Sequence, residues 1–240
     1  IQHLPQRLAA IEALGIETTL VLPFDEAMSQ IPAEMFIQGL YVDLGRIHSI
    51  CVGAHFAFGH QRQGNVELLQ RLGQEMNFIV HGLASISLDD ETVSSTRIRQ
   101  AIETGQLDAA GQMLGREYAL TGEVVQGDQR GRELGYPTAN LEVDGLCLPP
   151  NGVYAAHAQV GEITHRAAVN IGLRPTVADA EPSLHVEAHL LDFEGDLYGQ
   201  PLALTFVGKL RDETKFDSLD TLKTQIEKDL VSARYLFTQL

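Results

Sequence analysis

The sequence has only two cysteines, Cys51 and Cys147, and no Cys-x-x-Cys pair. This argues against a disulfide framework and against a cysteine-based zinc site, and free thiols are typical of a reducing compartment, so we expect a cytoplasmic protein. Long apolar runs are also absent, since no stretch approaches the roughly 18 residues that a membrane span needs. There is no basic segment followed by an apolar one, which would mark a secretion signal.

Basic residues are scarce as well. The chain has 17 Lys and Arg against 32 Asp and Glu, which gives a net charge of -15, and it has no basic run. Such a chain repels phosphate backbones and anionic lipid, so we do not expect nucleic-acid or membrane partners. Small phosphorylated ligands stay open, because a few arginines and backbone amides are enough to bind them.

With 240 residues, 44% of them hydrophobic, the chain is long enough for one large domain or two modest ones. In its first part helical and strand patterns alternate, which predicts a parallel sheet covered by helices. The expected elements are helices at 4–14, 33–42 and 65–72 and strands at 18–22, 47–52 and 77–80. The first of them is a helix, so we expect the opening strand of such a fold, with its loop, to be absent.

From Tyr118 onward the pattern changes to short strands separated by Gly, Pro and Asp turns. Five or six strands at this spacing predict a small closed barrel rather than a βαβ unit. The expected strands are 120–125, 153–160, 165–171, 184–191 and 202–210, and a final amphipathic helix should begin behind Asp217 and Ser218. We therefore expect α/β plus β architecture, with a domain boundary near residues 116–120.

A glycine-rich segment at 127–140 carries the densest chemical signal. Its three glycines let backbone amides approach a ligand and its two arginines supply charge for phosphate: Gly127, Gly131, Gly135, Arg130 and Arg132. Thr138 and Asn140 lie two positions apart, so their oxygens project to one side of an extended strand and suit Mg²⁺ held by ATP phosphates. An ordinary glycine-rich hairpin is the alternative.

This segment closely resembles the riboflavin kinase signature, and the whole chain is similar to the bacterial bifunctional riboflavin kinase/FMN adenylyltransferase (FAD synthetase) family. Further matching segments are Pro149 to Tyr154, Asn170-Ile171-Gly172 with Pro175-Thr176, Val186 to Gly199, and Lys215 to Leu219. The resemblance implies a Rossmann-like nucleotidyltransferase domain over residues 1–117, N-terminally incomplete. It also implies a small Greek-key β-barrel riboflavin kinase domain with a C-terminal helix over residues 118–240.

For the kinase half, the resemblance implies that Thr138 and Asn140 hold the Mg²⁺ of MgATP, with the loop from Gly127 to Gly135 around the nucleotide phosphates. It also implies that Glu187 is the general base that accepts the proton of the ribityl 5′-hydroxyl, which is consistent with the needs of phosphoryl transfer. Arg174 and Phe216 are the flavin candidates of this half. His185 and His189 flank Glu187, so a metal site made by these three side chains is an alternative.

In the first half, the run Ser94-Ser95-Thr96-Arg97 resembles the segment that holds ATP phosphates in the adenylyltransferase, although a plain helix cap explains the serines equally well. His55, Phe56 and Phe58 lie in a loop that resembles the flavin-contacting segment. Here His55 stands where Asn or Asp is usual and Ala57 where Arg is usual. The two phenylalanines can stack on a flavin or fill the core.

Family members begin with a Gly-x-Phe-Asp-Gly-x-His-x-Gly-His loop, and nothing in residues 1–20 matches it. We therefore expect this chain to phosphorylate riboflavin to FMN and to lack, or nearly lack, the adenylylation of FMN to FAD. The expected cofactor is Mg²⁺, with ATP, riboflavin and FMN as substrates. A flavin-binding or carrier protein without catalysis is the alternative, and self-association as a homo-oligomer is left open.

Overall fold

The computed structural model describes residues 1–174 and 183–239, and the expected Pro175-Thr176 segment lies outside them, as do the side chains of Arg130 and Arg174. The chain forms two compact units. One contains Ile1–Gly15 and Ser94–Leu240, and the other contains Ile16–Val93. The units therefore do not divide the chain at 117/118, because residues 94–117 pack in the same unit as the barrel.

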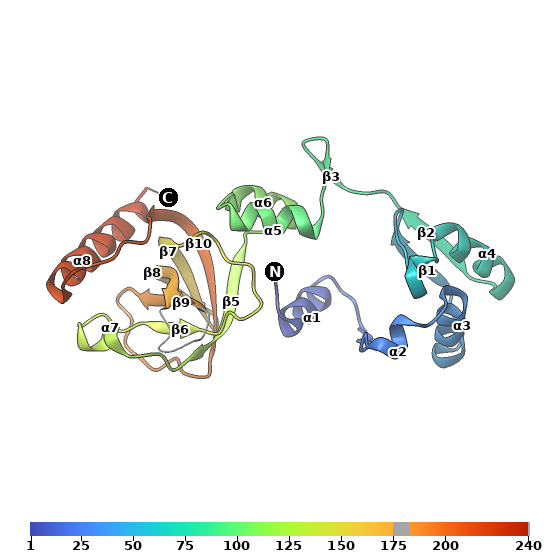
Figure 1. Ribbon diagram of the computed structural model, residues 1–240, viewed down its shortest axis with the longest axis horizontal. Coiled ribbons are helices and arrows are strands. Elements are labelled where there is room, and N and C mark those ends of the chain that lie inside the picture. The colour runs from blue at the N-terminus through green and yellow to red at the C-terminus, as the bar shows by residue number, and fades with distance from the viewer. Residues whose placement is uncertain (175–182, 240) are drawn as a thin grey trace. The chain divides into compact units, whose positions relative to one another are not determined.

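Six strands close into a barrel (Figure 1). They are β5 (Ala119–Val125), β6 (Ala139–Leu141), β7 (Gly152–Val160), β8 (Ile163–Arg174), β9 (Ser183–Leu190) and β10 (Pro201–Arg211). Their order around the barrel is β10, β5, β6, β9, β8, β7, and all neighbours are antiparallel. Strands β7, β8 and β9 thus form a meander and β10 returns beside β7, which is the Greek-key arrangement. The expected barrel is confirmed, with all five predicted strands present and β6 in addition.

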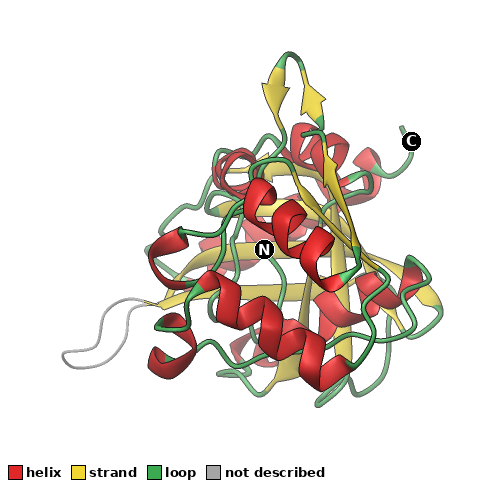
Figure 2. Ribbon diagram, turned by 90° about the vertical axis from the view of Figure 1, so that its right-hand side faces the viewer, coloured by secondary structure: helices red, strands yellow, loops and turns green. Residues whose placement is uncertain are grey.

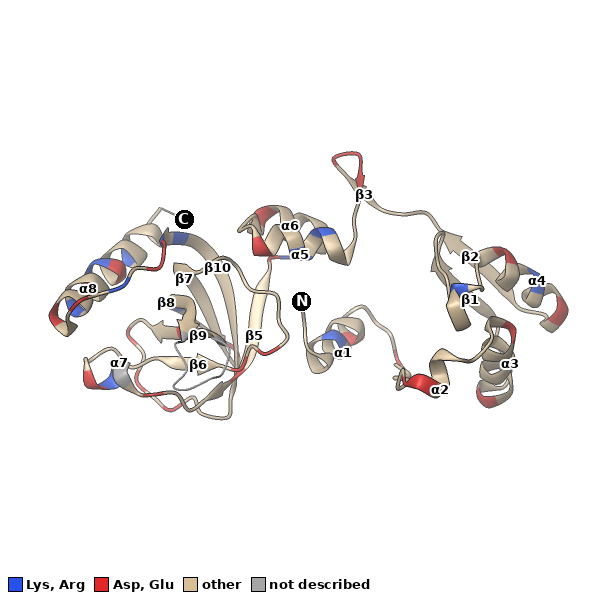
Figure 3. Cartoon of the chain, viewed as in Figure 1, with Lys and Arg blue, Asp and Glu red and all other residues tan. Residues whose placement is uncertain are grey.

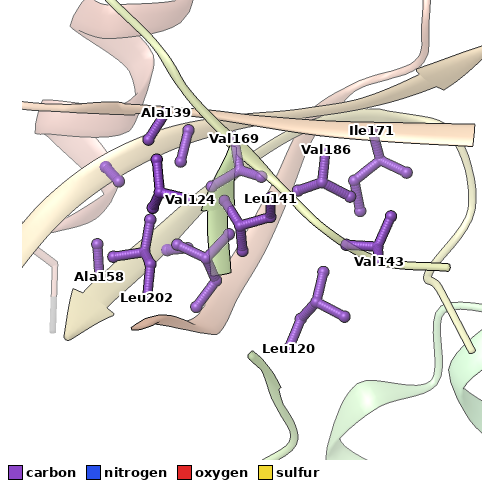
Figure 4. Packing of buried hydrophobic residues seen from close by; sticks show 14 of the residues in the cluster. Leu120, Val124, Ala139, Leu141, Val143, Ala158, Val169, Ile171, Val186 and Leu202 are labelled. Carbon is purple, nitrogen blue, oxygen red and sulfur yellow. The ribbon is translucent and has the colours of Figure 1, made fainter. Parts of the chain in front are cut away.

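The barrel interior is a packed apolar core (Figure 4). Leu204 and Val169 are completely buried in it, and Leu120 is 1% exposed. Because side chains alternate along a strand, the core also determines what faces outward. On β9, Val186 is buried in the core, whereas the next residue, Glu187, points to the outer surface of the barrel.

Helix α8 (Leu219–Leu236) covers the outside of the barrel. It begins as predicted, since the Ser218 side chain accepts a hydrogen bond from Thr221 N at 3.2 Å. Its fully buried Ala233 packs against Ala155 of β7, and these small side chains allow helix and sheet to approach closely. The outer face of α8 carries charges of both signs (Figure 3). The barrel and α8 together create the cavity described below.

The same unit includes helices α1 (Leu4–Ala13), α5 (Ser95–Glu103), α6 (Leu107–Leu114) and the short α7 (Arg130–Glu133). Cys147 links α5 to the barrel, because its thiol contacts the Arg99 carbonyl at 3.5 Å and its own carbonyl accepts a hydrogen bond from the Tyr118 hydroxyl at 2.6 Å. Burial raises the pKa of both groups, that of Cys147 to about 11 with a further contribution from the Glu103 carboxylate.

In the second unit, β1 (Ser49–Gly53) and β2 (Ile79–Leu83) pair in parallel, as the predicted α/β pattern requires. The other elements are α2 (Glu26–Ser29), α3 (Ala33–Leu44), the 3₁₀ turn η1 (His60–Arg62), α4 (Val66–Met76), and a hairpin of β3 (Ser87–Leu88) and β4 (Glu91–Thr92) that is visible in Figure 2. Asn65 caps α4, and its side chain accepts a hydrogen bond from Leu68 N at 2.9 Å. None of the described helices is long and apolar enough to cross a membrane.

The prediction of a strand at residues 18–22 is wrong. This segment is coil, and its apolar side chains are exposed, with Leu20 at 57% and Val21 at 51%. A β-rich run becomes a strand only when a neighbouring strand supplies hydrogen bonds and an apolar face. In the described part of the chain the parallel sheet consists of β1 and β2 alone, and neither pairs with this segment.

Candidate active site

A cavity with a volume of about 360 Å³ lies between the outer face of the barrel and α8. Its walls come from β8, β9, the glycine-rich loop, the segment between β10 and α8, and α8 itself. This volume is in the range of small-molecule sites. The lining combines apolar and polar side chains, as is usual for a small-molecule site. Its larger apolar members are Leu134, Leu173, Phe216, Leu222, Ile226 and Leu230.

A row of three polar residues crosses the strands next to this cavity. Asn140 of β6 pairs with Glu187 of β9, and Glu187 in turn pairs with Asn170 of β8. Residues directly opposite each other in a sheet project to the same face, and adjacent strands are about 5 Å apart. Glu187 and Asn170 both line the cavity. The barrel therefore presents a carboxylate flanked by two amides on its outer surface.

The glycine-rich loop packs directly on the metal candidates. A Cβ atom on Gly127 would clash with the side-chain amide of Asn140, and one on Gly131 would lie 3.2 Å from Thr138 Oγ1 and would clash with the Tyr136 carbonyl. Only glycine at these two positions allows the loop to lie so close to the side chains of Thr138 and Asn140. The two glycines thus explain how the loop, Thr138 and Asn140 come together at one end of the cavity.

His189 and Tyr136 complete this end of the site. The His189 Nδ1 atom lies 2.8 Å from the Pro137 carbonyl oxygen, which can only accept, so Nδ1 is the donor of this hydrogen bond. The edge of the His189 ring meets the Tyr136 ring at 6.0 Å between centroids. The Tyr136 hydroxyl donates to Glu227 of α8 at 3.1 Å, which connects the glycine-rich loop with the helix.

The donors present fit Mg²⁺ better than a transition metal. Within residues 1–174 and 183–239, no group of three or more His, Cys, Asp or Glu side chains could hold a metal ion, so the alternative site made by His185, Glu187 and His189 has no support. The hydroxyl of Thr138 and the amide oxygen of Asn140 are hard oxygen donors, which Mg²⁺ prefers, and Glu187 lies in the neighbouring register position.

A second cavity of about 250 Å³ adjoins the first. Thr138 lines both cavities, so it is the residue at which two bound molecules would meet. The second cavity has mixed walls, with the aromatic rings of Phe193 and Tyr198 and the charged side chains of Arg132 and Glu194. Two adjoining cavities place two bound molecules side by side, which is the arrangement that a group transfer between them uses.

Comparison with known proteins identifies two family segments in the chain. The family model described as riboflavin kinase matches residues 114–237, and the one described as FAD synthetase matches residues 1–97. The chain belongs to the bifunctional riboflavin kinase/FMN adenylyltransferase family. Its members catalyse two steps of flavin cofactor biosynthesis, and the cavity lies entirely in the riboflavin kinase segment.

Several relatives carry this bifunctional name. The protein from Pseudomonas fluorescens is 36% identical over 233 residues, which covers 97% of this chain and 75% of the relative. The protein from Escherichia coli K12 is 37% identical over 238 residues, which covers 99% of this chain and 75% of the relative. The fold also matches a crystal structure described as a macrolide-efflux protein from Streptococcus pneumoniae, with a TM-score of 0.79, 30% identity, and coverage of 97% of this chain and 74% of that one.

Of the kinase candidates from the sequence, Gly131, Thr138, Glu187 and Phe216 line the larger cavity. Phe216 also lies 5.7 Å from the Arg211 guanidinium, Arg132 lies in the second cavity, and Gly135 occupies an exposed turn at φ +88°. Sequence reasoning missed Arg211, although it lies four residues before Lys215, where the last matched segment begins. It also missed Asp229, for which no local pattern exists.

In the FAD synthetase segment, Ser94 caps α5. Its side chain accepts a hydrogen bond from Arg97 N at 3.2 Å, so the alternative of a plain helix cap is confirmed for this serine. Ser95 and Thr96 lie exposed in the first turn. They belong to the unit that contains the barrel, and the flavin candidates of this segment belong to the other unit.

Those flavin candidates follow β1, at the carboxyl end of the parallel strands, where such sheets bind ligands. His55 is exposed, and Phe56 is 40% exposed and stacks on Phe58 with 5.4 Å between ring centroids. Phe58 is 7% exposed and packs in the core of its unit. The core alternative therefore describes Phe58, while Phe56 keeps a free ring edge.

Proposed function

We propose that residues 118–240 transfer the terminal phosphate of ATP to the 5′-hydroxyl of riboflavin, giving FMN and ADP, and that residues 1–117 belong to the FMN adenylyltransferase. The observation that carries the first assignment is the row of Asn140, Glu187 and Asn170 beside a cavity of flavin size, with the glycine-rich loop packed on its end. A flavin carrier needs none of these polar groups.

In this proposal the isoalloxazine ring occupies the apolar part of the larger cavity, and the ribityl chain extends toward Glu187. The Glu187 carboxylate then accepts the proton of the 5′-hydroxyl as the oxygen attacks phosphorus. The half-buried position of Glu187 supports this role, since a carboxylate shielded from bulk water interacts more strongly with the attacking hydroxyl.

The nucleotide would lie in the second cavity, with its phosphates at the glycine-rich loop and its γ-phosphate near Thr138, where the two cavities join. Thr138 and Asn140 would hold the Mg²⁺ that accompanies ATP, with Gly127, Arg130, Gly131, Arg132 and Gly135 around the phosphates. When bound, Mg²⁺ neutralises charge on the transferring phosphate. Thr138 then has a positioning task, because it orients one substrate relative to the other.

For the adenylyl transfer, which joins AMP from a second ATP to FMN and releases pyrophosphate, the proposed contacts are Ser94, Ser95, Thr96 and Arg97 with phosphate. His55, Phe56 and Phe58 remain the proposed flavin contacts of that reaction, and Arg174 and Phe216 those of the kinase. We also propose a cytoplasmic location and no nucleic-acid partner, which the two unpaired cysteines and the net charge of -15 support.

The decisive experiment incubates the purified chain with riboflavin, ATP and Mg²⁺ and separates riboflavin, FMN and FAD by chromatography. Formation of FMN supports the kinase assignment, and further conversion to FAD supports the second activity in the same chain. Bound riboflavin without any product would overturn the kinase assignment in favour of a carrier. A parallel Mg²⁺ titration of Asn140→Ala should require more metal for half-maximal rate, and an unchanged titration would contradict the metal assignment.

A further inference from the structure

The segment between β10 and α8 forms one wall of the larger cavity. Strand β10 ends at Arg211 and α8 begins at Leu219, and between them Glu213, Thr214 and Phe216 face the cavity. These residues have no regular secondary structure of their own. Their position therefore depends on side-chain contacts, which include a hydrogen bond from Asn151 Nδ2 to Glu213 Oε2 at 3.1 Å and the contacts of Arg211.

Arg211 makes its contacts in three directions. Its Nε and Nη2 atoms donate to the Asp229 carboxylate of α8 at 2.8–3.0 Å, and its Nη1 atom donates to the Asp212 carbonyl at 2.8 Å. The face of its guanidinium lies 5.7 Å from the Phe216 ring centroid. One side chain thus joins the end of the strand, the connecting segment and the helix.

Asp229 is the one buried charged residue in the described part of the chain, at 7% exposure. Besides the two bonds to Arg211 Nε and Nη2, its carboxylate accepts a hydrogen bond from Gln225 Nε2 at 2.8 Å. A buried carboxylate with several charge-assisted hydrogen bonds is fixed in one geometry. The guanidinium and the carboxylate both line the cavity, so this geometry also shapes the binding site.

A second ion pair on α8 provides the natural comparison. Arg234 donates to Asp192, which follows β9, at 2.8 and 2.7 Å, and so also joins the helix to the barrel through a bidentate pair. The side chains of Arg234 and Asp192 are 45% and 60% exposed, whereas those of Arg211 and Asp229 are 22% and 9% exposed. Neither Arg234 nor Asp192 lines either cavity.

We infer that the Arg211–Asp229 pair positions the flavin indirectly, because the pair holds residues 212–218 in place as a preformed wall of the riboflavin site. This inference rests on the proposed function. Because the wall is ordered before the ligand arrives, riboflavin binding does not have to immobilise it. The pair touches no reacting atom, so its loss weakens riboflavin binding and leaves ATP binding unchanged.

The test compares Asp229→Asn with Asp192→Asn, two isosteric changes that each remove one charge from a bidentate pair on α8. Riboflavin affinity is measured by the change in the flavin's own fluorescence on binding, which is excited in visible light, where the protein does not absorb. Asp229→Asn should raise the riboflavin Kd about tenfold or more, the effect of disordering two or three side chains, with the KM for ATP unchanged within about twofold. Asp192→Asn should change neither value.

Limited trypsin digestion gives a second readout, since Lys215 is exposed within the segment. Cleavage after Lys215 should be faster in Asp229→Asn than in Asp192→Asn, and riboflavin should slow it. If Asp229→Asn does not fold, Arg211→Lys keeps a positive charge beside the carboxylate but loses the planar fork, and it should raise the riboflavin Kd in the same direction.

Three results would overturn the inference: wild-type riboflavin affinity in a folded Asp229→Asn or Arg211→Lys protein, a parallel loss of riboflavin and ATP affinity, or equal effects at Asp192. Failure of the proposed function would give a different result. The unmodified chain itself would then bind no riboflavin, or would bind it without forming FMN. Measurements on the unmodified chain therefore distinguish a wrong function from a wrong inference about the ion pair.

Discussion

Replacing Glu187 by glutamine removes the proposed general base while keeping the shape of the site. The residue is held by β6 on one side and β8 on the other, so the backbone has no freedom to move. Glutamine has nearly the same volume and occupies the same register position between Asn140 and Asn170. The expected loss is therefore chemical: turnover falls by about 10² to 10⁴, the usual contribution of a positioned base, equivalent to about 3–5 kcal/mol of activation free energy.

The assay is the initial rate of FMN formation at saturating riboflavin and MgATP, together with riboflavin Kd from flavin fluorescence. Glu123→Gln is the matched control, since Glu123 lies exposed on β5 of the same barrel and lines neither cavity. Glu187→Gln should lose turnover with nearly unchanged Kd, and Glu123→Gln should lose neither. A Glu187→Gln enzyme that keeps full turnover would refute the role of the carboxylate as base.

Four further predictions concern other parts of the chain. Gly127→Ala should displace the neighbouring Asn140 amide and raise the Mg²⁺ concentration needed for half-maximal rate, whereas Gly39→Ala, with open space around its Cβ position, should not. Leu204→Ala should lower the free energy of unfolding by about 2–5 kcal/mol in urea titration, because this side chain is completely buried in the barrel. Iodoacetamide at pH 8 should alkylate the exposed Cys51 well before Cys147, as peptide mass spectrometry can show, because burial raises the pKa of Cys147 to about 11. Since that pKa lies above the ordinary value of 9.0, the contribution of Cys147 to stability is present below pH 9 and is lost as the pH rises toward 11, which thermal unfolding at several pH values would detect.

Much of the fold could be predicted because alternation and capping are local signals. The five longer barrel strands and the cap of α8 at Ser218 followed from period-two patterns and one hydroxyl. β6 is only three residues long and follows Pro137, so it is too short to show a period-two pattern. The run at 18–22 failed for the opposite reason, since its composition favours a strand but no described strand pairs with it.

The site was less accessible to sequence reasoning. Thr138 and Asn140 have a local pattern, but Glu187 is one of 32 acidic residues, and only the family resemblance singled it out. Its partnership with Asn140 exists because β6 and β9 pair in a particular register, and nothing local in either segment specifies that register. Arg211 and Asp229 are likewise joined by the docking of a helix on a barrel, a tertiary contact that neither segment encodes alone.

The arrangement of Asn140, Glu187 and Asn170 on three neighbouring strands of the barrel has a consequence for how such a site can change. Their mutual spacing is set by main-chain hydrogen bonds between strands, so it is inherited from the barrel and does not depend on which side chains stand there. A substitution in this row therefore changes one functional group and leaves the positions of the other two unchanged. The loop and helix that surround the row can diverge freely, and with them the choice of substrate, while the distance between the reacting groups stays constant.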